Sequence, residues 1–480
     1  MSAEKTRTPL DRGVLIIAIV TLVGGIAVIL DSTIVSVALR DLASDLDASI
    51  ATIQWVSTGY LLALGVAIPL VGWLQKRLGA KRLWLAGLAV FLLGSLLSAC
   101  AWGVTSLIVF RVVQGLGGGV MLPLMVTIVM QAAKGENLGK LMATVSLPAA
   151  LGPILGPVIG GLLMSTGDWR WLFLVNLPVG VIGLVLAWRV LPADHHGAER
   201  ARLDFVGLLL LAPALVGLLW GLANVPKDGG LLRVDAIVPI GAGLALLIGF
   251  AFWAAGRGAK SLVDVRVLKH RQTWSATALL FLSGAALYGA LVLLPLFWQD
   301  IRGADALGAG ILLIPQGVGA LLSRFAAAQL TERFGARTVS IVGFAVVGAS
   351  TLPFAFADAD TSLWVLLAAL FVRGFGLSAV TMPLMTVAYV GLVHDEIPHA
   401  SILTRIAQQI GGAVGVALLT VILQSVAQTA SSPARAFDVA FWWACGFAAV
   451  AVVLSVVLPG KNLGRTTEND AQTERSVVSS

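Results

Sequence analysis

The run from Val14 to Leu39 is long and mostly apolar, and its one charged residue is a carboxylate, Asp31. At about 1.5 Å of rise per residue, roughly 20 apolar residues cross the hydrocarbon core of a bilayer, so this run predicts a membrane-spanning helix. A carboxylate near the middle of such a helix costs about 2.5–3.5 kcal/mol on insertion scales. Asp31 therefore needs a polar partner or a wet cavity, and it is the first candidate functional residue.

The composition of the whole chain extends this pattern. Of the 480 residues, 58% are hydrophobic and 12% are charged, and the mean hydropathy is +0.93. No soluble domain of this length has such a composition, so the sequence predicts an all-α, polytopic membrane protein. The first apolar run is too long for the core of a signal peptide and is expected to be retained. Both cysteines, Cys100 and Cys445, lie within apolar runs, which argues against a disulfide framework.

Charged, proline-rich and glycine-rich breaks divide the sequence into 14 predicted spans. The predicted spans are 14–39, 51–74, 83–102, 105–130, 141–164, 171–190, 205–224, 234–255, 273–300, 306–330, 338–357, 362–392, 399–425 and 438–458. An even number of spans places both termini on one side. The loops and tails of that side carry 22 Lys and Arg residues, against 6 on the opposite side. The positive-inside rule therefore places both termini in the cytoplasm, and the net charge of +7 reflects topology rather than a nucleic-acid partner.

Parts of the sequence repeat. The segment LQKRLGAK after the second span aligns with LTERFGAR after the tenth, at an offset of 256. FRVVQGLGGGVMLPLM in the fourth span corresponds loosely to FVRGFGLSAVTMPLM in the twelfth, and GPILGPVIGG in the fifth to QIGGAVG in the thirteenth. Each pair is eight spans apart, which predicts two six-helix bundles flanking an inserted pair of helices. Parallel repeats of this kind suit alternating access to a site between the halves.

The predicted organisation follows from this repeat. It comprises a cytoplasmic segment at 1–13, an N-terminal bundle at 14–190, two inserted helices at 205–255, a C-terminal bundle at 273–458 and a disordered cytoplasmic tail at 459–480.

Six stretches in the same order resemble the 14-helix drug/proton antiporter family of the major facilitator superfamily. They are LDSTIVSVAL, GWLQKRLGAKR, RVVQG, GPILGPVIGG, DWRWLFLVNLPVG and SLVDVRVLKHR. The resemblance runs from the first span to about residue 458 and implies the major facilitator fold. It further implies a proton-coupled antiporter, driven by the proton gradient without a cofactor, that exports amphiphilic drugs or natural products across a bacterial cytoplasmic membrane. The alternative is a dedicated exporter of one endogenous metabolite, or of a lipid-like or anionic product.

The expected partners are a small amphiphilic substrate, protons and the lipid bilayer, with the protein acting as a monomer. No GxxxxGK[ST] motif occurs, so an ion gradient rather than ATP is the expected source of energy. The histidines are scattered, and HDEIPH at 394–399 is expected to be a solvated loop rather than a metal site. We therefore do not expect an enzyme.

Asp31 and Arg111 are the candidates for proton coupling. Asp31 lies about 8 residues, roughly 12 Å, from the outer end of its span, and Arg111 lies about 6 residues, roughly 9 Å, below the same face. Burial favours the protonated form of a carboxylate, whereas a nearby arginine favours the ionised form. A site whose surroundings change could therefore load and release a proton. A static pair that anchors two helices is the alternative; the resemblance favours coupling, since the family's acid and arginine in these spans are implicated in it.

Several side chains within spans are candidates for binding the substrate. Gln114, one turn below Arg111, is expected to bond to the substrate, to Asp31 or to a neighbouring helix. Most aromatic residues in membrane helices serve packing or interfacial anchoring, so that alternative stays open for each of the others. The other candidates are Gln54, Trp55, Tyr60, Met121, Tyr288, Trp298 and Gln316.

Two motifs are candidates for a conformational switch. The resemblance implies that GWLQKRLGAKR latches neighbouring helix ends in one conformation, in addition to its positive-inside role. The acid usual before its arginine is Lys76 here, whereas the second copy keeps an acid, Glu332. The residues carried over are Gly72, Arg77, Gly79 and Lys81 in the first copy, with Glu332 and Arg333 in the second.

The second motif is GPILGPVIGG. Gly152, Gly156 and Gly160 share one helix face, where small residues allow close helix approach, and Pro153 and Pro157 favour a bend. The resemblance implies that this helix seals the cavity on one side. Ordinary close packing is the alternative.

The second half contains deep cations but no deep acid. Arg324, Arg373 and Arg405 lie within its predicted spans, so the deep charges of the chain are one aspartate against four arginines. This balance favours a neutral, zwitterionic or anionic substrate over a dication. The alternative is that Arg324 and Arg405, each near a cytoplasmic helix end, simply extend to the membrane surface.

Overall fold

The computed structural model describes residues 12–35, 38–133, 152, 155–156, 158–165, 167–193, 203–225, 233–392, 396–429 and 432–460. Within these ranges the chain is helical and contains no strand, and thirteen helices are long and apolar enough to cross a membrane. This confirms the predicted all-α membrane protein. The thirteen helices match all predicted spans except 141–164, most of which lies outside the described residues; positions 158–164 of that span are helical.

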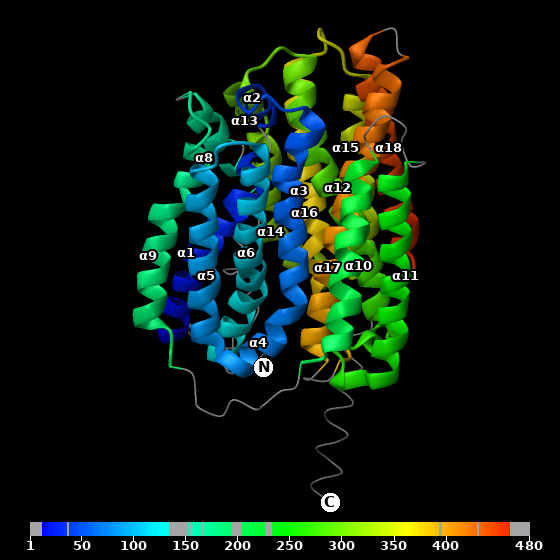
Figure 1. The fold of residues 1–480 in the computed structure, drawn as a ribbon. Coiled ribbons are helices and arrows are strands. Elements are labelled where there is room, and N and C mark those ends of the chain that lie inside the picture. Colours follow the sequence, from blue (N-terminus) through cyan, green and yellow to red (C-terminus); the bar gives the residue numbers. More distant parts are fainter. Residues whose placement is uncertain are drawn as a thin grey trace, which may run out of the picture.

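The helices of the first half form one bundle (Figure 1). They are α1 (Arg12–Ile34), α3 (Ile50–Ala67) with its continuation α4 (Val71–Leu78), α5 (Ala80–Ala99), α6 (Val104–Ala133), α8 (Trp171–Leu174) and α9 (Asn176–Val190), with the short α2 (Leu39–Asp45) between α1 and α3. Helix α6 packs against α1, α3 and α5, and α9 packs against α1 and α5. Four glycines of α6 permit this proximity; for example, a Cβ on Gly119 would lie 2.4 Å from the carbonyl oxygen of Leu64.

The second half repeats this arrangement. Its helices are α12 (Arg271–Asp300), α13 (Ala306–Leu312), α14 (Ile314–Phe334), α15 (Ala336–Thr351), α16 (Leu363–Ala388), α17 (Ile397–Ala427) and α18 (Pro433–Ser455). Helix α16 packs against α12, α14 and α15, as α6 packs against α1, α3 and α5, and α18 packs against α12 and α15 as α9 does against α1 and α5. The internal repeat inferred from sequence is therefore a repeat of helix packing.

The aligned loops share an unusual backbone turn. Gly79, between α4 and α5, has φ 87° and ψ 163°, and Gly335, between α14 and α15, has φ 82° and ψ 155°. Only glycine readily adopts this region of the backbone map. Two residues after each turn, a cation holds the last turn of the bundle, since Lys81 Nζ donates to Leu191 O at 2.7 Å and Arg337 Nε donates to Leu458 O at 2.5 Å.

The inserted helices α10 (Phe205–Asn224) and α11 (Val234–Arg257), green in Figure 1, pack against each other beside the two halves. Helix α10 contacts α3 of the first half and α17 of the second. Trp220 of α10 stacks on Trp55 of α3 with ring centroids 4.8 Å apart. The inserted pair therefore covers the seam along which α3 and α17 approach each other.

The two halves also share a buried apolar cluster. Ile402 and Ile406 of α17 belong to the same cluster as Leu64 and Ile68 of the first half. The N-terminal part of α17 is thus packed against the opposite half. The cavity described below opens between the halves further along α17.

Candidate functional site

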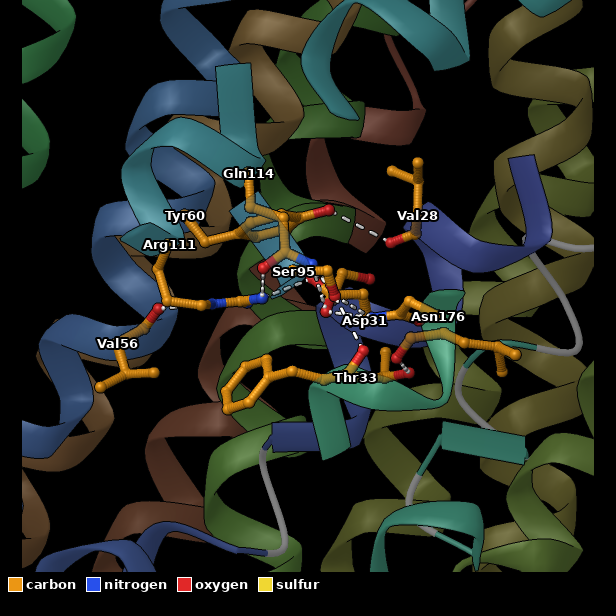
Figure 2. A network of polar contacts seen from close by, with 12 residues as sticks. Val28, Asp31, Thr33, Val56, Tyr60, Ser95, Arg111, Gln114 and Asn176 are labelled. Atoms are coloured by element: carbon orange, nitrogen blue, oxygen red, sulfur yellow. Dashed lines mark hydrogen bonds and ion pairs between the residues drawn. The ribbon is translucent and has the colours of Figure 1, made fainter. Parts of the chain in front are cut away.

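Asp31 and Arg111 form a buried ion pair (Figure 2). Arg111 Nη1 lies 2.5 Å from Asp31 Oδ2, and the two side chains are 1% and 0% exposed. Arg111 Nε donates to Val56 O at 3.1 Å, and its guanidinium lies 4.1 Å from the centre of the Tyr60 ring. The pair joins α1 to α6 and, through Val56 and Tyr60, to α3. The structure thus brings together the two residues that lie at similar depth in the sequence-based topology.

The second carboxylate oxygen of Asp31 is held by two amides. Gln114 Nε2 donates to Oδ1 at 2.9 Å, and Asn176 Nδ2 of α9 donates to the same atom at 2.8 Å. Both amides also donate to Ser95 Oγ at 3.1 Å, and Ser95 donates to Phe173 O at 2.9 Å. The described residues that contact Asp31 all donate hydrogen bonds to its carboxylate, and an ionised carboxylate can only accept them.

Ser95 and Asn176 were not among the residues singled out from the sequence. Asn176 lies in DWRWLFLVNLPVG, one of the six stretches that carry the family resemblance, and Ser95 is one of the few polar residues of α5. A polar side chain in an apolar span was the available signal. The partner of such a side chain depends on how the helix is rotated about its axis. The sequence of a nearly uniformly apolar helix does not indicate that rotation.

The fifth predicted span packs against α1 beside this network. Thr33 Oγ1 donates to Gly152 O at 3.0 Å. A Cβ on Gly152 would lie 2.3 Å from Ile29 Cγ2, and one on Gly156 would lie 1.9 Å from Thr33 Oγ1, so the close approach requires glycine. Gly160 is buried as well. Pro153 and Pro157 lie outside the described residues.

A cavity of about 100 Å³ lies between the two halves. Its lining comes from α1, the start of α2, α3, the inserted α10, α12 and α17. Two of the predicted substrate-binding residues, Gln54 and Tyr288, belong to it. A second cavity of about 50 Å³ adjoins it and shares Ser32, Leu61, Tyr288 and Gln409. Asp31 lines neither cavity, but the next residue, Ser32, lines both. The ion pair therefore lies directly behind the α1 wall of the cavity.

The remaining predicted substrate-binding residues lie in helix contacts instead, and none of them lines either cavity. Gln114 binds Asp31, and Tyr60 donates to Val28 O at 3.2 Å beneath the Arg111 guanidinium. Gln316 accepts a hydrogen bond from Arg373 at 3.2 Å. Apolar or aromatic packing holds the others: Trp55 against Trp220, Met121 against Gly24, and Trp298 in a buried cluster with Phe297 and Phe354.

Of the predicted switch residues of the loops, Arg77 and Arg333 make local contacts in this conformation, whereas Lys81 reaches Leu191 O of the same bundle. Arg77 lies over the ring of Trp73, 5.5 Å from its centre, and Arg333 lies over Phe334 at 5.2 Å. Glu332 is exposed. A Cβ on Gly72 would meet nothing within 4 Å, so no close packing in this conformation explains that glycine.

The deep arginines of the second half differ in their surroundings. Arg373 is 3% exposed and donates to Thr351 Oγ1 at 3.2 Å, Gln316 Oε1 at 3.2 Å and Ala286 O at 2.8 Å. Arg405 lines the smaller cavity, facing the first half, so its position differs from that of a side chain extended to the membrane surface. Arg324 lines neither cavity.

The described residues contain no group of three or more potential metal ligands. Of HDEIPH, His394 and Asp395 lie outside the described residues. His399 Nδ1 accepts a hydrogen bond from the backbone N–H of Asp264 at 3.1 Å. In this part of the chain, that motif is a contact between α17 and the segment before α12.

Comparison with known proteins gives a consistent result. A family model described as Major Facilitator Superfamily matches residues 21–416 and 280–478. The Multidrug resistance protein B homolog of Mycobacterium tuberculosis (strain ATCC 25618 / H37Rv) is 37% identical over 416 residues, which cover 86% of this chain and 77% of that protein. The Tetracenomycin C resistance and export protein of Streptomyces glaucescens is 31% identical over 84% of this chain and 74% of its own length. The Methylenomycin A resistance protein of Streptomyces coelicolor is 30% identical over 87% of both chains.

Proposed function

The chain belongs to the major facilitator superfamily, and on that premise we propose that it is a proton-coupled antiporter that exports amphiphilic drugs or natural products. The names of relatives at 30% identity or more support export, since they describe multidrug resistance, tetracenomycin C resistance and export, and methylenomycin A resistance. The two bundles, 14–190 and 273–458, are the parts that move relative to each other. The cavity between them is the substrate site.

One observation carries the coupling proposal: a buried acid lies directly behind the wall of the cavity. When ionised, Asp31 ties α1 to α6 through Arg111 and to α9 through Asn176. Protonation removes the charge that Arg111 neutralises, and it converts an acceptor oxygen into a donor facing other donors. The contacts that hold α1 then weaken. Because Val28 and Ser32 of α1 line the cavity, a shift of α1 changes the substrate site.

The helix ends and the fifth span supply the conformational switch in this proposal. Gly79 and Lys81, with Gly72 and Arg77, position the turn between α4 and α5, and Glu332 and Arg333 precede the matching turn of the second half. Gly152 and Gly156 hold the fifth span against α1, next to Asp31; Pro153, Pro157 and Gly160 belong to the same motif and are assigned to the switch with them. The asymmetry of Lys and Arg between the two sides supports a cytoplasmic location of both termini, and the bacterial relatives support the cytoplasmic membrane. We take the monomer as the functional unit.

The test measures proton movement. Purified protein in liposomes receives substrate, and the release of protons is followed with a pH-sensitive dye for the wild type and for Asp31→Asn. We expect Asp31→Asn to bind substrate and to lose substrate-induced proton release. Asp204→Asn is the matched control, because Asp204 caps α10 and contacts Trp253 and Leu262 away from the network. Unchanged proton release in Asp31→Asn would make the pair a static anchor and defeat the proposal.

A further inference from the structure

The charge of the cavity comes from one residue. Among the described residues that line the two adjoining cavities, Arg405 is the only one with a charged side chain. Asp31 and Arg111 lie behind the wall and form a pair without net charge. An occupant of the cavity therefore meets a single positive charge, in a space where water is scarce and the effective dielectric constant is low.

Among the described residues Arg405 has no counter-ion. Its side chain is partly buried, and in the described part of the chain it makes neither a hydrogen bond nor an ion pair. Arg373, in the same half, contrasts with it, since three acceptors satisfy that guanidinium. A guanidinium presents five N–H donors in a planar fork that matches a carboxylate or phosphate. Arg405 thus offers unused donors to whatever enters the cavity.

The donors around Arg405 are arranged along one face of α17. Gln408 and Gln409 lie one turn further along the helix and line the same cavity, and Tyr288 of α12 lies beside them. A Cβ on Gly412 would lie 2.5 Å from the Tyr288 ring, so this glycine lets the ring lie against α17. The side chains of Gln408, Gln409 and Tyr288 make no hydrogen bond within the described residues, and they are available to a ligand.

The same face of α17 becomes apolar beyond Gly412. Ala413, Val416 and Ala417 line the larger cavity, together with Leu219 and Ala223 of the inserted helix α10. From Arg405 to Ala417 the helix rises roughly 18 Å, which is the length of a drug-sized amphiphile. The opposite wall adds the uncharged polar side chains of Gln54, Ser57 and Thr58.

From these observations we propose that Arg405 is the specificity-determining residue of the substrate site and that the substrate is an amphiphile with one anionic group. The carboxylate, phosphate or phenolate end binds Arg405, assisted by Gln408, Gln409 and Tyr288. The apolar body lies along α17 against α10. This inference rests on the proposed export function and narrows its substrate class, and it gives the inserted helix α10 a role as one wall of the site.

The test uses three probes that share one apolar body: 4-(1-pyrenyl)butyrate, the corresponding alcohol, and the corresponding trimethylammonium. Their affinities for the reconstituted wild type, Arg405→Gln and Arg405→Lys are compared in zwitterionic vesicles at pH 7.5. Each probe partitions into the membrane equally for all variants. A difference in affinity between variants therefore reports binding to the protein. Arg324→Gln is the matched control, because it removes an arginine of the same half that lines neither cavity.

We expect the wild type to bind the carboxylate at least about tenfold tighter than the trimethylammonium probe, the factor that corresponds to about 1.4 kcal/mol. Arg405→Gln should reduce that ratio to about threefold or less while affinity for the alcohol changes by less than about twofold, which shows that the cavity is intact. Arg405→Lys should retain an intermediate preference, since it keeps the charge without the fork. Arg324→Gln should leave the ratio unchanged. A wild type that prefers the cation, or an unchanged ratio in Arg405→Gln, overturns the inference.

Two additions separate the remaining possibilities. Phosphatidylglycerol in the vesicles distinguishes an anionic lipid from a soluble anion: if it weakens pyrenylbutyrate binding only when Arg405 is present, the anionic ligand is a lipid, and if it has no effect the ligand is soluble. Both results retain recognition of an anionic group. Transport of the alcohol tests export independently. Proton release on its transport, with no charge preference, refutes this inference alone, whereas charge preference without transport or proton release refutes the export function alone.

Discussion

The two halves bury an arginine at corresponding places, but only one of the two arginines meets a carboxylate. In the first half, Arg111 of α6 contacts Asp31 of α1 and the carbonyl of Val56 in α3. In the second half, Arg373 of α16 contacts the carbonyl of Ala286 in α12 and the amide of Gln316 in α14. Helices α12 and α14 occupy the places of α1 and α3 in the repeat. The second half thus presents uncharged acceptors where the first presents an acid.

This difference indicates separate roles for the two halves. The Arg111 network contains a group that can gain a proton, so its charge can change during a transport cycle. The Arg373 network contains no acid among the described residues, and hydrogen bonds alone compensate the burial of its cation. The first half is therefore suited to respond to protons. The second half contributes a fixed cation, Arg405, to the cavity.

The largest effects are expected when each of the two buried arginines is replaced in turn, because this tests directly whether the two halves differ. Arg111→Gln leaves Asp31 buried without a cation, and breaking a buried pair in this way costs about 3–5 kcal/mol. Arg373→Gln strands no charge and leaves three acceptors incompletely satisfied, at about 1–3 kcal/mol. We expect Arg111→Gln to lower the unfolding temperature more and to abolish proton release, and Arg373→Gln to retain proton release.

The double variant Asp31→Asn/Arg111→Gln provides the control for this experiment. It removes both charges, so it should recover much of the stability that Arg111→Gln loses, as a thermal unfolding series in detergent would record. Equal losses of proton release in Arg111→Gln and Arg373→Gln would mean that the two halves do not divide the work as proposed.

The glycine contacts of the two halves provide a second, smaller test. A Cβ on Gly156 would lie 1.9 Å from Thr33 Oγ1 of α1, and one on Gly415 of α17 would lie 2.4 Å from Ala285 O of α12. Each alanine should destabilise the protein by about 1–3 kcal/mol through overpacking. Only Gly156→Ala displaces the helix that carries Asp31, so only this variant should also impair proton release. Gly65→Ala, with nothing within 4 Å of the new Cβ, is the control, and impaired proton release in Gly415→Ala would contradict the division.

Much of this comparison could be anticipated from the sequence, because it depends on position along the chain. The offset between LQKRLGAK and LTERFGAR pairs Gly79 with Gly335, and the structure gives both the same backbone turn. Depth along the helices placed Asp31 and Arg111 at one level, where they meet. The spacing of charged residues, the lengths of the spans and the composition of the loops predict such positions along the chain well.

The faces of the helices could not be anticipated in the same way. Trp298 was expected to line the cavity but lies in an aromatic cluster, and Met121 packs against α1. In a soluble protein the apolar stripe of a helix shows which face is buried, whereas the apolar residues of α1 and α6 are spread around the helix and form no single stripe. Which residues face the cavity is then decided by small residues on neighbouring helices and by polar contacts, both of which depend on the assembled bundle.

The shared turn offers a test in which the two halves should respond alike. Gly79→Ala and Gly335→Ala each place a Cβ in a backbone region that only glycine adopts readily, and we expect each to cost about 1–2 kcal/mol. Gly72→Ala, seven residues before Gly79, meets open space and should be nearly neutral for stability. Unfolding temperatures of the three variants check this. If one of the two turn variants lost much stability and the other lost none, the two turns would not be structurally equivalent.

The smallest expected effect concerns the cations that follow those turns. Lys81→Met removes the hydrogen bond to Leu191 O, and Arg337→Met removes the hydrogen bond to Leu458 O, at the last carbonyls of each bundle. A single such bond contributes about 0.5–1.5 kcal/mol, and partial exposure places both at the lower end. Methionine keeps the apolar length of the side chain, so packing of the stem is preserved. Hydrogen exchange of the backbone amides near Leu191 and Leu458 measures the loosening directly. Faster exchange at Leu191 in Lys81→Met, and at Leu458 in Arg337→Met, would show that each cation holds the end of its own bundle; faster exchange across both bundles in either variant would instead show that these loops connect the halves.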